Sequence, residues 1–193
     1  IDEASDRVIM NYCICRQSDG CKDYPTEYGC LFLGEAARQI HPDMCRAATK
    51  EEAKDHVRKC EEAGLIHLVG RAYADCVWLG IKGPHDQLFT ICNCCPCCCI
   101  SLAVPYISDH LTDWFQKMPG VHMVVDEDAC VGCGKCEESC IYGGVRVENK
   151  QTAIFTDACR ACGRCITVCK TDAIRLVIED ENYVKNTIEQ LAP

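Results

Sequence analysis

The chain has 193 residues, of which 21 are cysteine, and a formal net charge of -9. This acidity argues against a nucleic-acid-binding protein, which needs a basic surface. It favours a protein partner with a positive docking patch, although plain solubility would also account for it. The most apolar window, residues 91–107, is short and interrupted by Asn93, Pro96 and Pro105, so no membrane span is expected.

So many cysteines in a short chain usually indicate a secreted disulfide scaffold. Here the odd number of cysteines cannot pair completely, and no secretory signal pattern precedes them, although the chain starts at Ile1 rather than Met. We therefore expect a reducing, cytoplasmic location. The length allows two small domains. We expect a cysteine-rich domain over 1–120, a second domain over 121–180, and a helix or tail over 181–193.

The first predicted elements are helices. Apolar residues at helical spacing favour a helix over residues 28–40. A second helix is predicted from Thr49, which with Glu52 forms a capping-box pattern, to Gly64, a typical helix-ending residue. Its apolar stripe includes Cys60.

Two strands are predicted next, over residues 65–69 and 88–92, and a third helix over residues 108–118. We therefore expect a mainly helical N-terminal domain within an α+β protein. The strand at 88–92 would present the most unusual segment of the chain, Cys-Asn-Cys-Cys-Pro-Cys-Cys-Cys at residues 92–99.

The N-terminal region holds thirteen cysteines. In an extended segment, Cys92, Cys94 and Cys98 would face one side and Cys95, Cys97 and Cys99 the other. Cys45, Cys60 and Cys76 are isolated and are expected to be buried apolar residues. The candidate metal ligands are Cys13, Cys15, Cys21, Cys30, Cys92, Cys94, Cys95, Cys97 and Cys98.

Three interpretations of these ligands remain open. They could hold one or two further 4Fe-4S clusters or a larger noncubane cluster with its own reactivity. They could also be structural zinc ligands or unligated thiols. Arg16 could donate hydrogen bonds to a cluster or be a surface charge. His67 could ligate iron, as histidine does in Rieske centres, but a packed histidine is the simpler expectation.

Beyond residue 120 two cysteine runs share one spacing. Three cysteines at two-residue gaps allow a loop to wrap a 4Fe-4S cubane, and the fourth reaches a different cluster. Zinc usually takes two separated pairs instead. The first run is Cys130, Cys133, Cys136 and Cys140, and the second is Cys159, Cys162, Cys165 and Cys169.

The flanks of these runs repeat as well. Strands are predicted over residues 121–125 and 174–178, and a hairpin over 145–147 and 153–155. Gly132, Gly134 and Gly163 lie inside the cysteine loops, where positive φ or close approach to the cluster is needed. Strand, loop, short helix and strand thus occur twice, which indicates an internal duplication.

Residues 121–179 resemble the bacterial two-cluster ferredoxins. The resemblance implies that Cys130, Cys133, Cys136 and Cys169 hold one 4Fe-4S cluster, and that Cys159, Cys162, Cys165 and Cys140 hold the other. The proline usual after each fourth cysteine is replaced by Ile141 and Lys170. The N-terminal region is similar to cysteine-rich ferredoxin-like proteins with CxCR and CNCCxCCC elements, which implies iron-sulfur electron transfer.

We therefore expect an electron-transfer subunit that relays single electrons between 4Fe-4S clusters and a partner oxidoreductase. The alternatives are a reductase with a reactive N-terminal noncubane cluster and a structural iron-sulfur subunit of a larger complex. No glycine-rich nucleotide loop and no nucleophile beside a base is recognisable. Arg160 and Arg164 in one loop, against Glu137 and Glu138 in the other, predict unequal cluster potentials.

Overall fold

The computed structural model describes residues 1–100, 116–149, 151–182, 185–186 and 189. Contacts divide the chain into two compact units, the first built mainly from residues 1–99 and the second from residues 100–185. Helices and strands occur together, which confirms the α+β class. The domain limits at 120 and 180 stay predictions, and most of the predicted helix at 108–118 lies outside the described residues. No helix in the described segments has the length and apolar character needed to span a membrane.

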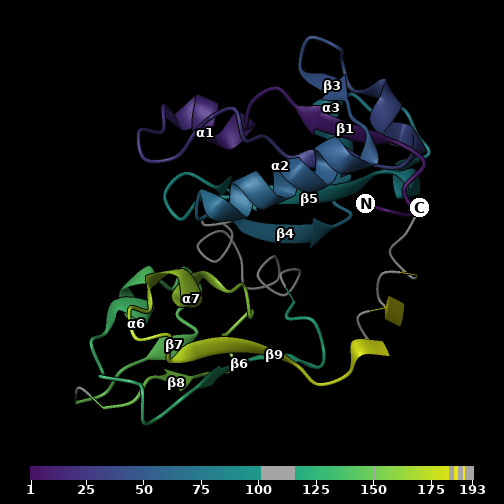
Figure 1. Ribbon diagram of the computed structural model, residues 1–193. Coiled ribbons are helices and arrows are strands. Elements are labelled where there is room, and N and C mark those ends of the chain that lie inside the picture. Colours follow the sequence, from purple (N-terminus) through teal and green to yellow (C-terminus); the bar gives the residue numbers. More distant parts are fainter. Residues whose placement is uncertain (101–115, 150, 183–184, 187–188, 190–193) are drawn as a thin grey trace. The chain divides into compact units, whose positions relative to one another are not determined.

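A five-stranded antiparallel sheet organises the first unit (Figure 1). Its strands are β1 (Arg7–Met10), β2 (Leu31–Leu33), β3 (Cys45–Ala47), β4 (Ile66–Gly70) and β5 (Phe89–Cys94), in the spatial order β3-β1-β2-β5-β4. The predicted strands at 65–69 and 88–92 are confirmed as β4 and β5. The last residues of β5 carry the start of the cysteine-rich run.

Helices cover both faces of this sheet. They are α1 (Ile14–Asp19), η1 (Glu35–Gln39), α2 (Lys50–Glu62), α3 (Tyr73–Leu79) and η2 (His85–Gln87). On the α2 face, Ala53 packs with Ile9, Leu31 and Leu33. On the opposite face, η1 and α3 contribute to a core with Val8, Met10, Phe32 and Leu88. Alternate residues of β1 and β2 therefore enter different cores, as the pleat requires.

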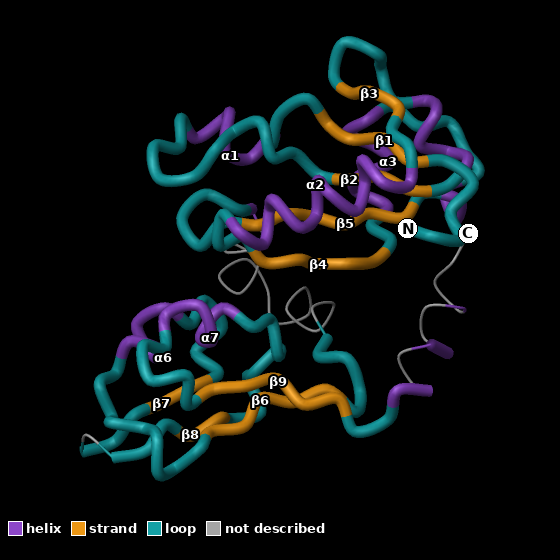
Figure 2. Tube along the Cα trace, viewed as in Figure 1, coloured by secondary structure: helices purple, strands orange, loops and turns teal. Residues whose placement is uncertain are grey.

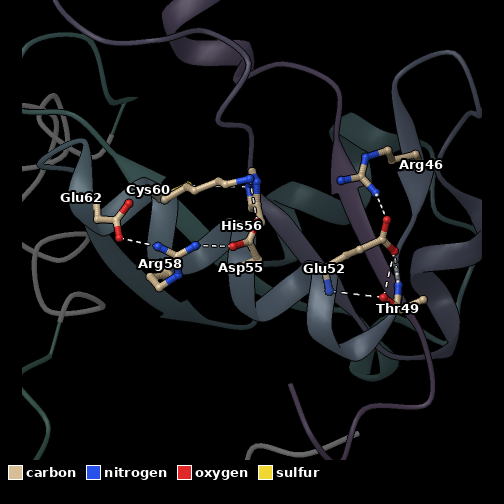
Figure 3. Close-up of polar contacts among 9 residues, drawn as sticks. Arg46, Thr49, Glu52, Asp55, His56, Arg58, Cys60 and Glu62 are labelled. Atoms are coloured by element: carbon tan, nitrogen blue, oxygen red, sulfur yellow. Dashed lines mark hydrogen bonds and ion pairs between the residues drawn. The ribbon is translucent and has the colours of Figure 1, made fainter.

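The predicted capping box of α2 is confirmed (Figure 3). The Thr49 hydroxyl accepts a hydrogen bond from Glu52 N at 3.2 Å, and Glu52 Oε2 accepts one from Thr49 N at 2.8 Å. Beyond the helix, Gly64 has φ 77°, the left-handed conformation expected of it. These contacts fix both ends of the helix that covers the cysteine-bearing strand.

The predicted helix over residues 28–40 is wrong, because this segment forms β2 followed by η1. Gly29 packs against β1, where a Cβ atom would lie 2.6 Å from Met10 O, and Gly34 has φ 94°. Pairing of β2 with β1 and β5 outweighs the helical spacing of the apolar residues. The helices of the N-terminal region, which was expected to be mainly helical, pack on a five-stranded sheet. Two of its strands, β2 and β3, have only three residues each, too few to show an alternating pattern.

Among the described residues of the second unit, two antiparallel strand pairs and two short helices carry the cysteine runs (Figure 2). The elements are β6 (Val121–Val125), α6 (Lys135–Ser139), β7 (Val145–Arg146), β8 (Ile154–Phe155), α7 (Arg164–Val168) and β9 (Ile174–Ile178). Pairing of β6 with β9 and of β7 with β8 confirms the predicted strands and hairpin. Cys136 and Cys165 are buried with Met123, Val145 and Ile174, so both cysteine runs border one core.

Candidate metal centres

Two hollows in the second unit are lined by cysteines from both runs. The first hollow is bordered by Cys130, Cys133, Cys136 and Cys169. The second hollow is bordered by Cys140, Cys159, Cys162 and Cys165. Each hollow therefore combines three cysteines of one run with the fourth of the other. The resemblance to two-cluster ferredoxins implies the same two sets.

The cysteine loops follow the duplication closely. Gly134 and Gly163 precede α6 and α7 with φ 78° and φ 80°. Cys140 and Cys169 end these helices with the same backbone angles, φ -80° and ψ 107°. Each short helix thus aims one buried cysteine inward and leaves its run's fourth cysteine at its end, from which the chain leads to the other hollow.

Gly144 brings the two runs together, a feature that the sequence analysis missed. A Cβ atom at Gly144 would lie 2.4 Å from Cys159 Cα and 2.6 Å from Cys159 N. Any side chain there would push the second run away from the loop after Cys140. The Gly144 amide also donates a hydrogen bond to Cys140 Sγ at 3.2 Å. A glycine four residues after the last cysteine of a run is the only signal that could have indicated this contact.

Sulfur atoms in the two hollows have different surroundings. Burial raises the pKa of the Cys165 thiol to about 12. Burial also raises the pKa of Cys169, but hydrogen bonds from Thr171 and from the backbone N–H groups of Ala173 and Ile174 outweigh it, so this pKa lies below its ordinary value. In the second run the Ala161 amide donates to Cys159 Sγ at 3.4 Å. Backbone N–H groups therefore already point at sulfur in both runs, as a thiolate ligand requires.

An orphaned donor supports the fit of an inorganic cluster to the second hollow. Arg160 borders this hollow, and its Nε atom is buried with no hydrogen-bond partner. An anionic cluster with exposed sulfide would supply an acceptor there. Arg164 borders the second hollow too, whereas Lys135 borders the first. Glu137 instead accepts a hydrogen bond from Val147 N at 3.0 Å, and Glu138 is exposed.

A third set of cysteines lies in the first unit. The sulfur atoms of Cys21, Cys95, Cys97 and Cys98 are all within 4.8 Å of one another. Cys21 follows α1, and the other three follow β5. The Cys98 amide donates to Cys95 Sγ at 3.3 Å. Burial raises the pKa of Cys21, but backbone hydrogen bonds from Asp23 and Tyr24 contribute to a pKa below its ordinary value.

A further row of thiols lies beside this set. Cys30 Sγ and Cys92 Sγ are 3.7 Å apart, and Cys94 Sγ and Cys99 Sγ are 3.0 Å apart. The expected division of the run is therefore wrong for two residues: Cys98 groups with Cys95 and Cys97, and Cys99 with Cys94. The alternation fails because β5 ends at Cys94 and the chain turns at Pro96. Cys99, absent from the predicted ligands, belongs to this row, while Cys13 is buried near Cys15 at the start of α1.

Arg16 is not the surface charge that was one of its two expected roles. Its side chain is fully buried, and Arg16 Nε donates to Pro25 O at 2.9 Å while Nη1 donates to Asn93 O at 2.8 Å. Nη2 donates to Tyr28 O. Arg16 thus ties α1 and the following loop to the end of β5, and its charge lies near the sulfur atoms of Cys13 and Cys95.

His56 and His67 belong to a polar network around Asn93. His67 Nδ1 lies 2.8 Å from Asn93 Oδ1, and Asn93 Nδ2 donates to Gly29 O at 2.7 Å. His56 Nε2 lies 2.8 Å from Gly29 O. It also lies 3.7 Å from Cys60 Sγ, on the same helix (Figure 3). Because His67 lies against Asn93, the packed role expected for it has geometric support.

The comparison with known families concerns the second unit. Residues 122–170 match the family of 4Fe-4S dicluster domains. No curated protein and no solved structure matches the chain. This match supports a ferredoxin-like 4Fe-4S dicluster domain in the second unit, and such a domain implies iron-sulfur electron transfer. The N-terminal unit is distinguished by its many cysteines.

Proposed function

We propose that the protein is an electron-transfer module with two 4Fe-4S clusters held by crossed ligand sets. Cys130, Cys133, Cys136 and Cys169 would hold one cluster, and Cys159, Cys162, Cys165 and Cys140 the other. The observation that carries this proposal is that these two sets border two separate hollows. Such clusters, when bound, accept and release single electrons at potentials between roughly -700 and +450 mV.

The residues of the second unit bind, shield and tune these centres. Thiolate sulfur atoms provide the ligands, and Met123, Val145 and Ile174 provide a buried apolar core around them. Exclusion of water by such a core strengthens the electrostatic effect of each neighbouring charge. Arg160 beside the second hollow would stabilise added negative charge there, so we expect its cluster to have the higher potential.

The first hollow is the expected site of contact with a redox partner. Cys133, one of its ligands, is exposed, as is the neighbouring Val131 with 65% of its surface accessible. Exposed acidic residues accompany this run: Asp126, Glu127, Asp128, Glu137 and Glu138. An acidic surface around an apolar contact favours a transient partner with a basic patch. The partner class is therefore a redox protein or oxidoreductase subunit with a positive docking surface.

The direct test is redox titration of the full chain prepared without oxygen. We expect two one-electron centres with the electron paramagnetic resonance signals of reduced 4Fe-4S clusters, and iron and sulfide in equal amounts. Cys133→Ser should remove or alter one centre, whereas Cys45→Ser, a matched change in the first unit, should alter neither. Colourless protein, or protein with zinc in place of iron at the crossed sets, would refute the proposal.

The acidic contact surface has its own test with small electron donors. Glu127→Gln together with Glu138→Gln should slow reduction by the cationic methyl viologen radical at low salt, and leave reduction by the anionic dithionite radical unchanged or faster. The difference should vanish at high ionic strength, because salt screens exposed charges. Equal effects on both donors would contradict the assigned contact surface.

A further cluster in the N-terminal unit stays a prediction. Its best-supported ligands are the row formed by Cys30, Cys92, Cys94 and Cys99, which lies on the sheet face opposite α2. A signal unlike that of a cubane in the wild-type protein, lost in Cys92→Ser, would favour the reductase alternative. An ordinary cubane signal lost in the same variant would favour a longer electron relay.

A further inference from the structure

We propose that Cys21, Cys95, Cys97 and Cys98 bind a single zinc ion in a tetrahedral site, separate from any iron-sulfur centre. Their four sulfur atoms form the one group of three or more Cys, His, Asp or Glu ligand atoms, within the described part of the chain, that lie within 4.8 Å of one another. Four thiolates are a complete ligand set for structural zinc.

The distances between these sulfur atoms fit one metal ion. A Zn–S bond of about 2.3 Å gives tetrahedral sulfur atoms roughly 3.8 Å apart. Cys21 Sγ and Cys97 Sγ are 3.7 Å apart, and Cys97 Sγ and Cys98 Sγ are 3.5 Å apart. These two distances fit a single-ion tetrahedron, and the other sulfur pairs of the set lie within 4.8 Å.

The crossed sets of the second unit provide an internal comparison. In neither crossed set do the sulfur atoms all lie within 4.8 Å of one another, although all eight cysteines are described. Each crossed set instead lines one of the two hollows, where a larger inorganic core would sit. The second unit thus has two sets of four thiols around a hollow, whereas the first unit has one contracted set, whose sulfur atoms lie within 4.8 Å of one another.

The surroundings of the contracted set suit a permanent thiolate site. The Cys98 amide points at Cys95 Sγ, and Cys95 is buried among Cys60, Leu65 and Tyr24. The Arg16 cation lies near Cys95 and offsets part of the negative charge of four thiolates, whereas the Asp19 carboxylate contacts Cys98. Divalent zinc binds more tightly than ferrous iron to a given set of ligands, so zinc is the expected occupant.

The site would join two segments far apart in sequence. Cys21 lies in the loop after α1, and the other ligands lie in the turn after β5. Arg16 already ties these segments through Asn93 O. Zinc would join the loop after α1 to the turn after β5 a second time, on the side that faces solvent, where Cys97 is exposed. Its role would be structural, because four protein ligands leave no open position.

The test is the zinc and iron content of the full chain, with X-ray absorption at the zinc edge. We expect about one zinc per chain that survives dialysis, bound by four sulfur atoms at about 2.3 Å. Cys21→Ser should weaken zinc binding at least tenfold in competition with a chromophoric chelator, and leave iron and sulfide unchanged. Cys45→Ser is the matched control and should keep the zinc.

A conservative variant tests whether the loss of zinc from Cys21→Ser results from misfolding instead of from the missing ligand. Cys97→His should retain one zinc with three sulfur ligands and one nitrogen, because histidine is a normal zinc ligand and position 97 is exposed. Wild-type protein without tightly held zinc, or equal zinc in the wild type and in Cys21→Ser, would overturn the inference. Loss of iron and sulfide instead of zinc from Cys21→Ser would overturn it in favour of a cluster. Iron bound by the second unit is unaffected in each case, so this test is independent of the proposed function.

Discussion

Ala161 occupies in the second cysteine run the position that Gly132 occupies in the first. Each directly precedes the second cysteine of its run, and their φ angles are 51° and 61°. Glycine adopts this left-handed conformation freely, whereas a Cβ atom makes it costly. The duplication has therefore kept the backbone shape of the loop even where the residue that favours it has been replaced.

Ala161→Gly should make the second cysteine loop more stable. Relief of the left-handed strain should raise the free energy of unfolding by about 1–2 kcal/mol. The greater freedom of glycine in the unfolded chain should offset about 0.5–1 kcal/mol of this gain. We expect slower loss of visible cluster absorbance in guanidinium chloride for anaerobic protein. The mirror variant, Gly132→Ala, should bleach faster than the wild type. Faster bleaching of Ala161→Gly would contradict the account.

Arg160→Gln should lower the midpoint potential of one cluster and leave the other in place. The variant removes a positive charge that borders the second hollow. An interaction change of about 1 kcal/mol corresponds to roughly 40 mV for a one-electron couple. Potentiometric titration followed by electron paramagnetic resonance measures both centres in one sample.

Lys135→Gln provides the control, because Lys135 borders the first hollow. It should lower the potential of the other centre. Equal shifts of both centres in each variant, or no shift in either, would show that these side chains do not distinguish the clusters.

Arg16→Lys should destabilise the N-terminal unit strongly. Lysine cannot donate at once to Pro25 O, Tyr28 O and Asn93 O, and buried carbonyl groups lose their partners. We expect a loss of about 3 kcal/mol or more. Hydrogen exchange should rise in peptides from residues 1–99 and stay unchanged in those from 121–180.

Arg38→Lys is the matched change at an exposed position, where Arg38 pairs with Asp6 at 2.6 Å. Surface ion pairs contribute about 1 kcal/mol or less, so little effect is expected. Similar exchange in the two variants would show that Arg16 is not a structural clamp.

The sequence predicted most of the second unit because its signals are local. Cysteine spacing, loop glycines and alternating strands each lie within a few residues, and β6, β9 and the β7–β8 hairpin follow them. The close approach of Gly144 to Cys159 was not predicted, since it depends on how the two repeats pack.

The first unit was harder to predict because its contacts are distant in sequence. The capping box at Thr49 and Glu52 identified α2, but the pairing of β2 with β1 and β5 overrode the helical spacing of the apolar residues over 28–40. The prediction for the cysteine run at residues 92–99 assumed an extended chain. Because the chain turns at Pro96, Cys98 lies with Cys95 and Cys97, and Cys99 lies with Cys94. The burial of Arg16 depends on three carbonyl groups that no local pattern brings together.

The crossed arrangement is tested most directly by two double variants with equal numbers of substitutions. Cys130→Ser with Cys169→Ser removes two ligands from the first hollow, whereas Cys130→Ser with Cys140→Ser removes one ligand from each. The measurement is the cubane signal and the iron of the second unit in anaerobic protein. We predict that the first double variant keeps one intact cubane, with about four irons, and that the second keeps none. An intact cubane in the second variant and none in the first would contradict the crossed sets.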